Sequence, residues 1–90
     1  MLVALIAQDR SNAAQVRADN RAAHLDYIKS TGCVMQAGPF LNPEGQMIGS
    51  MIILDVPDMS AAEDWADNDP YAQAGLFEAA TLTQWNKVIG

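Results

Sequence analysis

The sequence predicts one α+β domain, residues 1–90, in which two helices cover one face of a four-stranded antiparallel sheet. A second copy of the chain is expected to cover the other face. Three observations predict this arrangement. The length of 90 residues fits one small domain, with no linker or repeat dividing it. Segments with strand and helix periodicity follow one another in the order β-α-β-β-α-β. The first and third predicted strands carry apolar side chains on both faces, although two helices can cover only one face.

The first strand and the first helix form the N-terminal part of the chain. Residues 2–8 (LVALIAQ) are an almost continuous apolar run, as expected for a strand covered on both faces. The helix that follows is predicted to start with Asn12 as its N-cap and Gln15 three positions later, and to end at Gly32. Its packed face is predicted from helical spacing to be Val16, Asn20, Ala23 and Tyr27, flanked by His24 and Ile28.

A hairpin is predicted in the middle of the chain. Residues 33–41 (CVMQAGPFL) form its first strand, in which Gly38 and Pro39 distort or end the regular pairing. Residues 42–45 (NPEG) have the composition of a type I turn. The second strand of the hairpin, residues 47–56, presents Ile48, Ile52 and Leu54 on one face and Met47, Met51 and Ile53 on the other.

The C-terminal third supplies a second, shorter helix and the last strand. Residues 60–63 (SAAE) have the spacing of a capping box and are predicted to open the helix. Asp69 and Pro70 form a standard pair of N-cap and first helical residue, so they start a further turn. Residues 77–89 are the last strand, with Thr81, Thr83 and Trp85 on one face.

This order of elements is the split β-α-β plan of ferredoxin-like domains. A sheet face in water would not carry as much apolar surface as the first and third strands do. We therefore predict a homodimer, or a higher homo-oligomer, in which two sheets pack face to face, about 10 Å apart.

Charge and composition exclude several classes of partner. The net charge of −6 and the pI of about 4.3 argue against nucleic acid and against an anionic membrane surface. The five Lys and Arg residues still allow one local positive pocket and a small anionic ligand. A single cysteine excludes an internal disulfide. Because the sequence also shows no signal-peptide core and no membrane span, we expect a cytoplasmic location. No zinc pattern and no phosphate-binding loop is present, so neither metal nor cofactor is predicted.

His24, the only histidine, and Asp69 are the candidate acid–base pair. His24 lies beside the packed face of the helix, where it is either a half-buried structural imidazole or a general acid or base. Asp69 is a helix cap whose carboxylate can also orient the imidazole and fix its tautomer. Both interpretations stay open for each residue.

Four segments resemble the YciI-like proteins, in order and spacing over nearly the whole chain. They are RAAHLDYI (21–28), AGPF (37–40), GQMIGSMIIL (45–54) and DPYAQAGLF (69–77), the last followed by a strand with a tryptophan. The resemblance implies a dimeric α+β barrel with a histidine and an aspartate at a cleft. Carried over by motif, these catalytic residues are His24 and Asp69. The reaction of most members of that family is unassigned.

The predicted substrate-binding residues are Arg21, Tyr27, Gly38, Pro39 and Tyr71. Each has an alternative interpretation. The tyrosines can be core aromatics, and Gly38 can relieve a bend before Pro39. Arg21, or Arg17 on the same side of the helix, can hold a carboxylate or be solvated or salt-bridged.

Two functions from different classes follow. The first is a cofactor-independent enzyme in which His24 moves a proton on a small cyclic or carbonyl-containing molecule, by elimination, isomerisation or hydrolysis. The second is a non-catalytic dimeric module that binds a small ligand or stabilises a partner. Cofactor-free oxygenation, as in relatives of the same fold group, ranks lower because no Asn/His/Trp constellation stands out.

Overall fold

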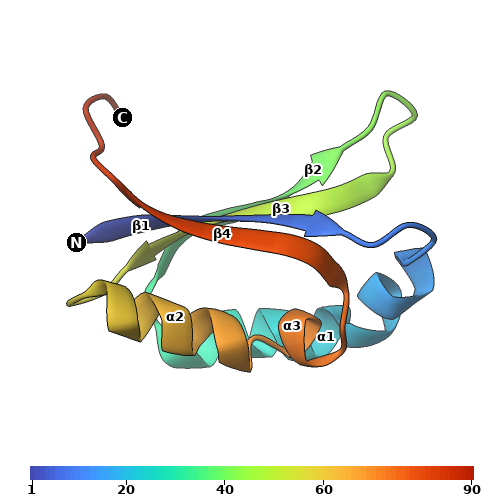
Figure 1. Cartoon of the computed structure of the whole chain (residues 1–90), viewed down its shortest axis with the longest axis horizontal. Helices are drawn as coiled ribbons and strands as arrows, with labels where there is room; N and C mark the ends of the chain where they lie inside the picture. The colour runs from blue at the N-terminus through green and yellow to red at the C-terminus, as the bar shows by residue number, and fades with distance from the viewer.

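The computed structural model describes all residues from 1 to 90 and consists of one sheet with helices on one face (Figure 1). The elements are β1 (Leu2–Asp9), α1 (Ala14–Thr31), β2 (Val34–Leu41), β3 (Met47–Asp55), α2 (Met59–Asn68), α3 (Pro70–Gln73) and β4 (Phe77–Trp85). The four strands lie in the order β2-β3-β1-β4, and every neighbouring pair is antiparallel. The predicted ferredoxin-like fold is confirmed.

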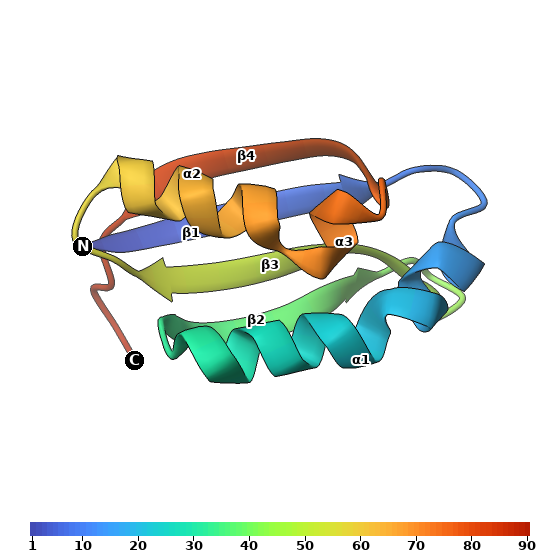
Figure 2. The same cartoon turned by 90° about the horizontal axis from the view of Figure 1, so that it is seen from below.

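The hydrophobic core lies between the sheet and the helices. Figure 2 shows α1 along the β2 side of the sheet and α2 along β1 and β4. The central strands alternate, so that one set of side chains faces the helices. The core cluster consists of Val3, Leu5, Ile52, Leu54, Val56, Ala62 and Trp65.

The predicted start of α1 is wrong in detail, while its predicted end is confirmed. Asn12 does not cap the helix, because its backbone is in the left-handed region with φ 58°. Ala13 occupies the N-cap position and makes no side-chain capping hydrogen bond. At the other end, Gly32 has φ 67° and its N–H donates a hydrogen bond to the carbonyl of Ile28. Only glycine adopts this cap conformation without strain.

The packed face of α1 also differs from the prediction. Ala23 is exposed, whereas Arg17 and His24 are the buried residues of the helix, each with 6% exposure. Two ionisable residues can occupy this face because each is bonded to a buried carboxylate. Periodicity of apolar residues alone does not detect such a face.

Gly38 and Pro39 neither end nor distort the pairing of β2, contrary to the prediction. Gly38 pairs with Met51 and Pro39 with Ser50, and the register shifts lie elsewhere, near the two ends of the strand. The strand tolerates a proline because β2 is at the edge of the sheet, where the missing N–H can face away from the neighbour. The turn at residues 42–45 forms as predicted, and the Gly45 N–H donates a hydrogen bond to the carbonyl of Asn42.

The capping residue of α2 and the end of β4 also need correction. Asp58, not Ser60, caps α2, and its carboxylate accepts a hydrogen bond of 2.8 Å from the Ala61 N–H. The helix therefore begins earlier than the capping-box spacing indicated. The last strand ends at Trp85, and residues 86–90 form a tail that leaves the sheet on its open side (Figure 1).

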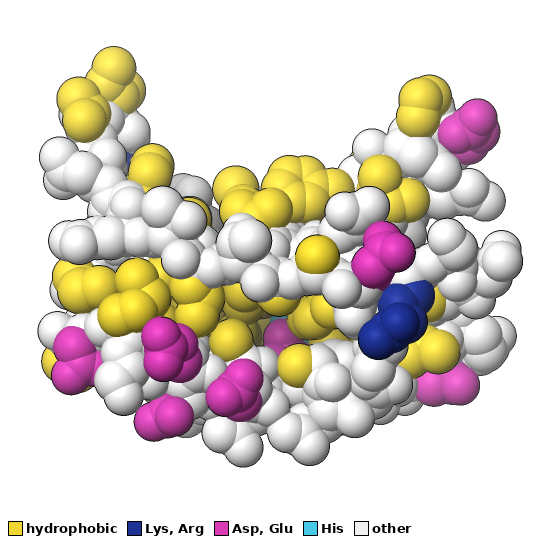
Figure 3. All heavy atoms as spheres, viewed as in Figure 1, with side chains coloured by type: hydrophobic (Ala, Val, Ile, Leu, Met, Phe, Trp, Pro, Cys, Tyr) yellow, Lys and Arg dark blue, Asp and Glu magenta, His cyan; other side chains and the backbone are white.

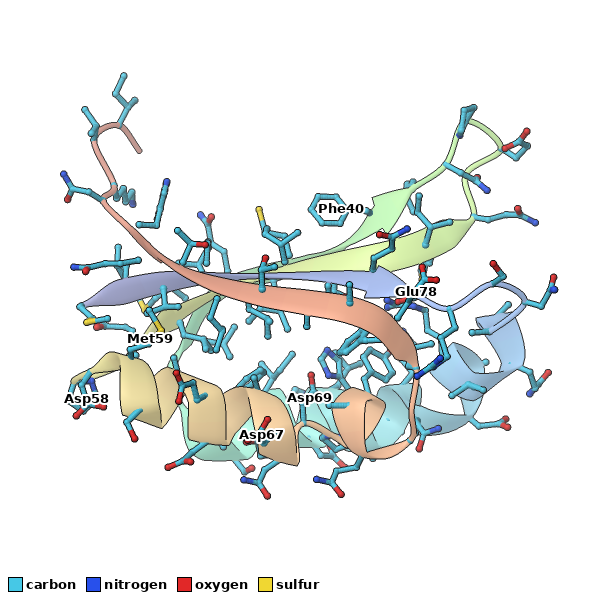
Figure 4. All side chains as sticks on the ribbon, in the orientation of Figure 1. Phe40, Asp58, Met59, Asp67, Asp69 and Glu78 are labelled. Carbon is cyan, nitrogen blue, oxygen red and sulfur yellow. The ribbon has the colours of Figure 1, made fainter.

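The sheet face opposite the helices is uncovered and apolar. Figure 3 shows hydrophobic side chains gathered along this face. Ile6, Phe40, Met51 and Trp85 are each between 38% and 41% exposed, and Figure 4 shows Phe40 standing above the sheet. None of the helices has the length and apolar character needed to cross a bilayer.

Candidate active site

The imidazole of His24 is hydrogen-bonded to the carboxylate of Asp69, with 2.7 Å between Nδ1 and Oδ1. The side chain of His24 is 8% exposed and that of Asp69 is fully buried. His24 is in the middle of α1, and Asp69 lies at the junction of α2 and α3, on the side of the helices that faces the sheet (Figure 4). The fold therefore brings together the two residues of the predicted acid–base pair.

Local sequence fixes the position of Asp69. It is the N-cap of α3, and Pro70 is the first helical residue, as the sequence predicted. The same oxygen that contacts His24 also accepts a hydrogen bond of 3.0 Å from the Tyr71 N–H. The other oxygen, Oδ2, is buried and has no hydrogen-bond partner. An ionised carboxylate only accepts hydrogen bonds, so Nδ1 of His24 is the donor and Nε2 is the nitrogen left for chemistry.

Tyr71 holds the imidazole from its other side. The two rings are stacked, with centroids 3.9 Å apart and planes inclined by 15°. Burial raises the pKa of the Tyr71 phenol above its usual value, and the charge of Arg17 only partly opposes this effect. Tyr71 is therefore a neutral phenol at neutral pH.

A cavity of about 190 Å³ lies between α1 and the β2–β3 part of the sheet. Its polar lining residues are Arg17, Arg21, His24, Ser50 and Tyr71. The rest of the lining is Leu25, Ile28, Ala37, Gly38, Pro39, Met47 and Ile52. The lining includes no Asp or Glu. Since cavities of about 150 Å³ hold benzene, the size suits a molecule of one ring.

Arg17 anchors one wall of this cavity. Its Nε and Nη2 donate to the two carboxylate oxygens of Asp9, at 2.8 and 2.9 Å. Nη2 also donates to the carbonyl of Gly49 at 3.0 Å and to the hydroxyl of Ser50 at 2.9 Å. Burial by itself would lower the pKa of Arg17, but the hydrogen bond and charge of Asp9 raise it above its usual value. The guanidinium also lies 4.8 Å from the centre of the Tyr71 ring, a cation–π contact that helps to hold the ring that stacks on His24.

A larger open groove of about 950 Å³ adjoins the cavity and shares Arg17, Arg21 and Met47 with it. The connection between β1 and α1 forms much of this groove, together with Phe40 and residues 46–48 of the hairpin. No three side chains of His, Cys, Asp or Glu lie together as a metal site would require.

The structure places most of the predicted substrate-binding residues at the cavity. Arg21, Gly38, Pro39 and Tyr71 line it together with His24. Asp69 does not line it, and reaches it only through the imidazole.

Tyr27 is the exception among the predicted residues. Its hydroxyl donates to the carbonyl of Trp65 at 2.8 Å, and its ring lies 4.9 Å from the Trp65 ring. It is therefore a packing residue between α1 and α2. It lies nearly one turn further along the same face of α1 as His24, where it meets Trp65 of α2 and is not part of the cavity lining.

Sequence reasoning missed Ser50 and Asp9, and gave Arg17 only as an alternative to Arg21. The one available signal was position. Ser50 shares a strand face with Ile52 and Leu54, so it is a polar residue at a core-facing register position. Asp9 ends β1 and carries no local signal of its role.

Together, the fold and the site define a class of small α+β proteins in which a histidine on the first helix meets a carboxylate at the start of a later helical turn. Within this class the chain belongs to the YCII-related domain family, whose model matches residues 1–86. It is 33% identical to protein YciI of Escherichia coli over 98 residues, an alignment that covers 99% of this chain and all of that protein.

Two solved structures share the fold of this chain, one of them with similar sequence. The chain is 33% identical to 5-chloro-2-hydroxyhydroquinone dehydrochlorinase from Burkholderia phenoliruptrix, solved in complex with 2,5-dihydroxybenzoquinone. The TM-score is 0.87, and the match covers 96% of this chain and 94% of that one. An antibiotic biosynthesis monooxygenase matches with a TM-score of 0.61 at 11% identity, which is a likeness of fold alone.

Proposed function

We propose that this protein is a small cofactor-independent enzyme that moves a proton on a one-ring molecule, with His24 as general base and then general acid. One observation carries the proposal. The only imidazole of the chain is bonded through Nδ1 to a fully buried carboxylate, and it lines a cavity of ring size. A histidine oriented in this way is suited to acid–base catalysis.

The reaction class that we propose is elimination. As general base, Nε2 of His24 takes a proton from an O–H group of the ring substrate, and as general acid it gives that proton to the ring carbon that carries the leaving group, so that a C=O bond forms and this carbon becomes saturated. His24 then takes a proton from a second, conjugated O–H or C–H group, whose electrons move through the ring to form a new double bond at the saturated carbon. The bond between that carbon and the leaving group breaks, the leaving group departs as an anion with the electrons of that bond, and the imidazolium releases the second proton to the solvent. The 33% identity to a dehydrochlorinase over nearly the whole chain supports elimination over isomerisation or hydrolysis.

Asp69 acts as a positioning residue in this proposal. It fixes Nδ1 as the protonated nitrogen and stabilises the imidazolium that forms during the reaction. Tyr71 holds the ring plane through the stacking contact. Its neutral phenol, which lines the cavity, supplies a hydrogen-bond donor to the substrate.

The test is a substrate screen with the wild type and with His24→Asn. The first compound is 5-chloro-2-hydroxyhydroquinone, followed by other chlorinated phenols and small lactones. We expect chloride release or ring conversion by the wild type and a loss of about 10²-fold or more in His24→Asn. Lys29→Gln, a change of an exposed residue on the same helix, is the matched control. Turnover that survives in His24→Asn would refute the proposal, and ligand binding without turnover of any compound would indicate the non-catalytic module instead.

We also propose that the protein is a homodimer that buries the open face of the sheet. Ile6 and Met51 are paired neighbours near the middle of that face and are 40% and 38% exposed. Apolar surface of this kind is typical of interfaces. Sedimentation equilibrium of the wild type is expected to give twice the chain mass, and Met51→Lys is expected to give monomers. Glu44→Lys, at the hairpin turn, is the control for an added lysine. A wild-type monomer at all concentrations would refute the dimer.

A further inference from the structure

We infer that the cavity recognises an anion through the hydroxyl of Ser50, the guanidinium of Arg17 and the side chain of Arg21. The substrate class is a one-ring molecule that carries an ionised oxygen, as a phenolate, an enolate or a carboxylate. The identification of this anion as a substrate rests on the proposed function, whereas the recognition of the anion does not.

The hydroxyl proton of Ser50 is free to point into the cavity because the hydroxyl oxygen accepts a hydrogen bond from Arg17. An arginine has only donors, so the 2.9 Å bond from Nη2 makes the hydroxyl oxygen an acceptor. The carbonyl of Gly49, the residue before Ser50, also accepts a hydrogen bond from Arg17. Ser50 makes no other side-chain hydrogen bond, is 3% exposed and lines the cavity. Its O–H is therefore a buried donor without a protein acceptor.

Arg17 is held in a fixed position beside Ser50. Its hydrogen bonds to Asp9, Gly49 and Ser50 all run through Nε and Nη2, and the side chain of Tyr71 is a further partner of the guanidinium. Asp9 holds the guanidinium in one orientation, so its positive charge is fixed at the cavity wall. Arg17 lines both the cavity and the adjoining groove.

Charge around the cavity is opposite in sign to the charge of the whole protein. The chain has a net charge of −6 and five Lys and Arg residues. Arg17 and Arg21 both line the cavity, and no carboxylate does. Arg21 takes part in none of the ion pairs of the protein, so its charge is not neutralised by a neighbour. The charged residues that line the cavity are therefore both positive, although the protein as a whole is acidic. Such a cavity is suited to an anionic ligand.

The same donors assist the proposed chemistry. Removal of a proton by His24 leaves negative charge on the ring, and hydrogen bonds fixed in advance stabilise that charge most in the transition state. Ser50 and His24 line one cavity, on β3 and α1 respectively. Ser50 thus reaches the anionic oxygen from the sheet side, whereas Arg17, Arg21 and the base His24 all lie on α1.

Calorimetric titration with benzoate and benzamide tests the inference. The two probes have the same shape and differ in charge. We expect benzoate to bind at least about tenfold more tightly than benzamide to the wild type. Ser50→Ala is expected to lower the affinity for benzoate about tenfold and to leave that for benzamide unchanged. Arg21→Gln is expected to weaken benzoate binding in the same direction, and Lys29→Gln, which removes the same charge from an exposed position of the same helix, is expected to leave it unchanged.

Equal affinity for the two probes would overturn the inference, as would an unchanged preference in Ser50→Ala with its fold intact by circular dichroism. Failure of the proposed function has a different signature. His24→Asn is expected to lose turnover and to keep the preference for benzoate over benzamide. If benzoate binds selectively but no compound is turned over, the anion site stands and the enzyme proposal falls. If turnover depends on His24 but benzoate is not preferred, the enzyme proposal stands and the anion site falls.

Discussion

His24 and Tyr71 are stacked ring on ring, with their centroids 3.9 Å apart, and both are tied to one oxygen of Asp69. The imidazole reaches that oxygen with Nδ1, and Tyr71 reaches it with its backbone N–H. A single carboxylate oxygen therefore sets both the cap of α3 and the orientation of the histidine. The stacked Tyr71 ring restricts the rotation of the imidazole that the hydrogen bond at Nδ1 still allows. The structural and the proposed functional roles of Asp69 are performed by the same atom.

Replacement of Asp69 by Asn separates these two roles. Asparagine is also a good N-cap, so we expect the stability in urea to fall by no more than about 1 kcal/mol relative to wild type. The charge that stabilises the imidazolium is lost, so kcat is expected to fall about 10²-fold or more while KM changes little. Asp67→Asn, at an exposed neighbouring position, is the matched control for both measurements. A kcat equal to wild type would show that Asp69 is only a cap, and the ¹⁵N shifts of the His24 ring would then be unchanged too.

Arg17→Leu is expected to destabilise the protein strongly. The side chain of Asp9 is 7% exposed, so the substitution leaves a buried carboxylate without its partner. Breaking a buried pair in this way costs about 3–5 kcal/mol in the free energy of unfolding. Urea denaturation measures the loss, with Lys29→Leu as a surface control that changes stability by less than about 0.5 kcal/mol. Adding Asp9→Asn to Arg17→Leu is expected to restore part of the stability. Equal stability of Arg17→Leu and the control would contradict the role assigned to this pair.

Two glycines of the hairpin are expected to respond differently to alanine. A Cβ on Gly49 would overlap the carbonyl oxygen of Ala7 and lie 3.3 Å from the Phe40 ring. A Cβ on Gly38 meets no atom within 4 Å. Gly49→Ala is therefore expected to cost about 1–3 kcal/mol, and Gly38→Ala close to nothing, in thermal or urea unfolding.

Gly38→Ala also tests the use of that residue by a ligand. Gly38 lines the cavity, so an added methyl group removes space that a ring would fill. Unchanged stability with weaker ligand binding would support close approach of the ligand to this strand. Unchanged binding would leave Gly38 as a residue of the edge strand alone.

Stability is expected to fall at alkaline pH through the tyrosines. Burial raises the pKa of Tyr27, as does the nearby charge of Asp69. The folded protein therefore retains the phenolic proton at a pH at which the unfolded chain has released it. The stabilisation is complete below the unfolded pKa of about 10 and is lost as the pH rises through the folded pKa. Urea unfolding at about pH 8 and about pH 10.5 measures this loss. Tyr27→Phe is expected to make the free energy of unfolding less dependent on pH, and an identical slope in that variant would refute the assignment.

Much of the site was accessible from the sequence, although by two different routes. The cap-and-proline pair at Asp69 and Pro70 is a local signal, and it formed as predicted. The link between His24 and Asp69 came from the resemblance to the YciI-like proteins, since the two residues are 45 positions apart. Ser50 was missed because its partner, Arg17, is 33 positions away on another element. Tyr27 was misplaced because periodicity does not show which neighbour a helical side chain faces.

The sequence by itself determined the order of the elements, the turn at residues 42–45, the glycine end of α1 and the start of α3. Each depends on the backbone preferences of residues within a few positions of one another. Only the tertiary structure decided that Arg17 and His24 are buried and that Tyr27 faces α2. It also decided that the hydroxyl of Ser50 is left to donate into the cavity. These outcomes depend on strand register and on the rotation of α1 about its axis, which distant contacts fix together when the helices pack on the sheet.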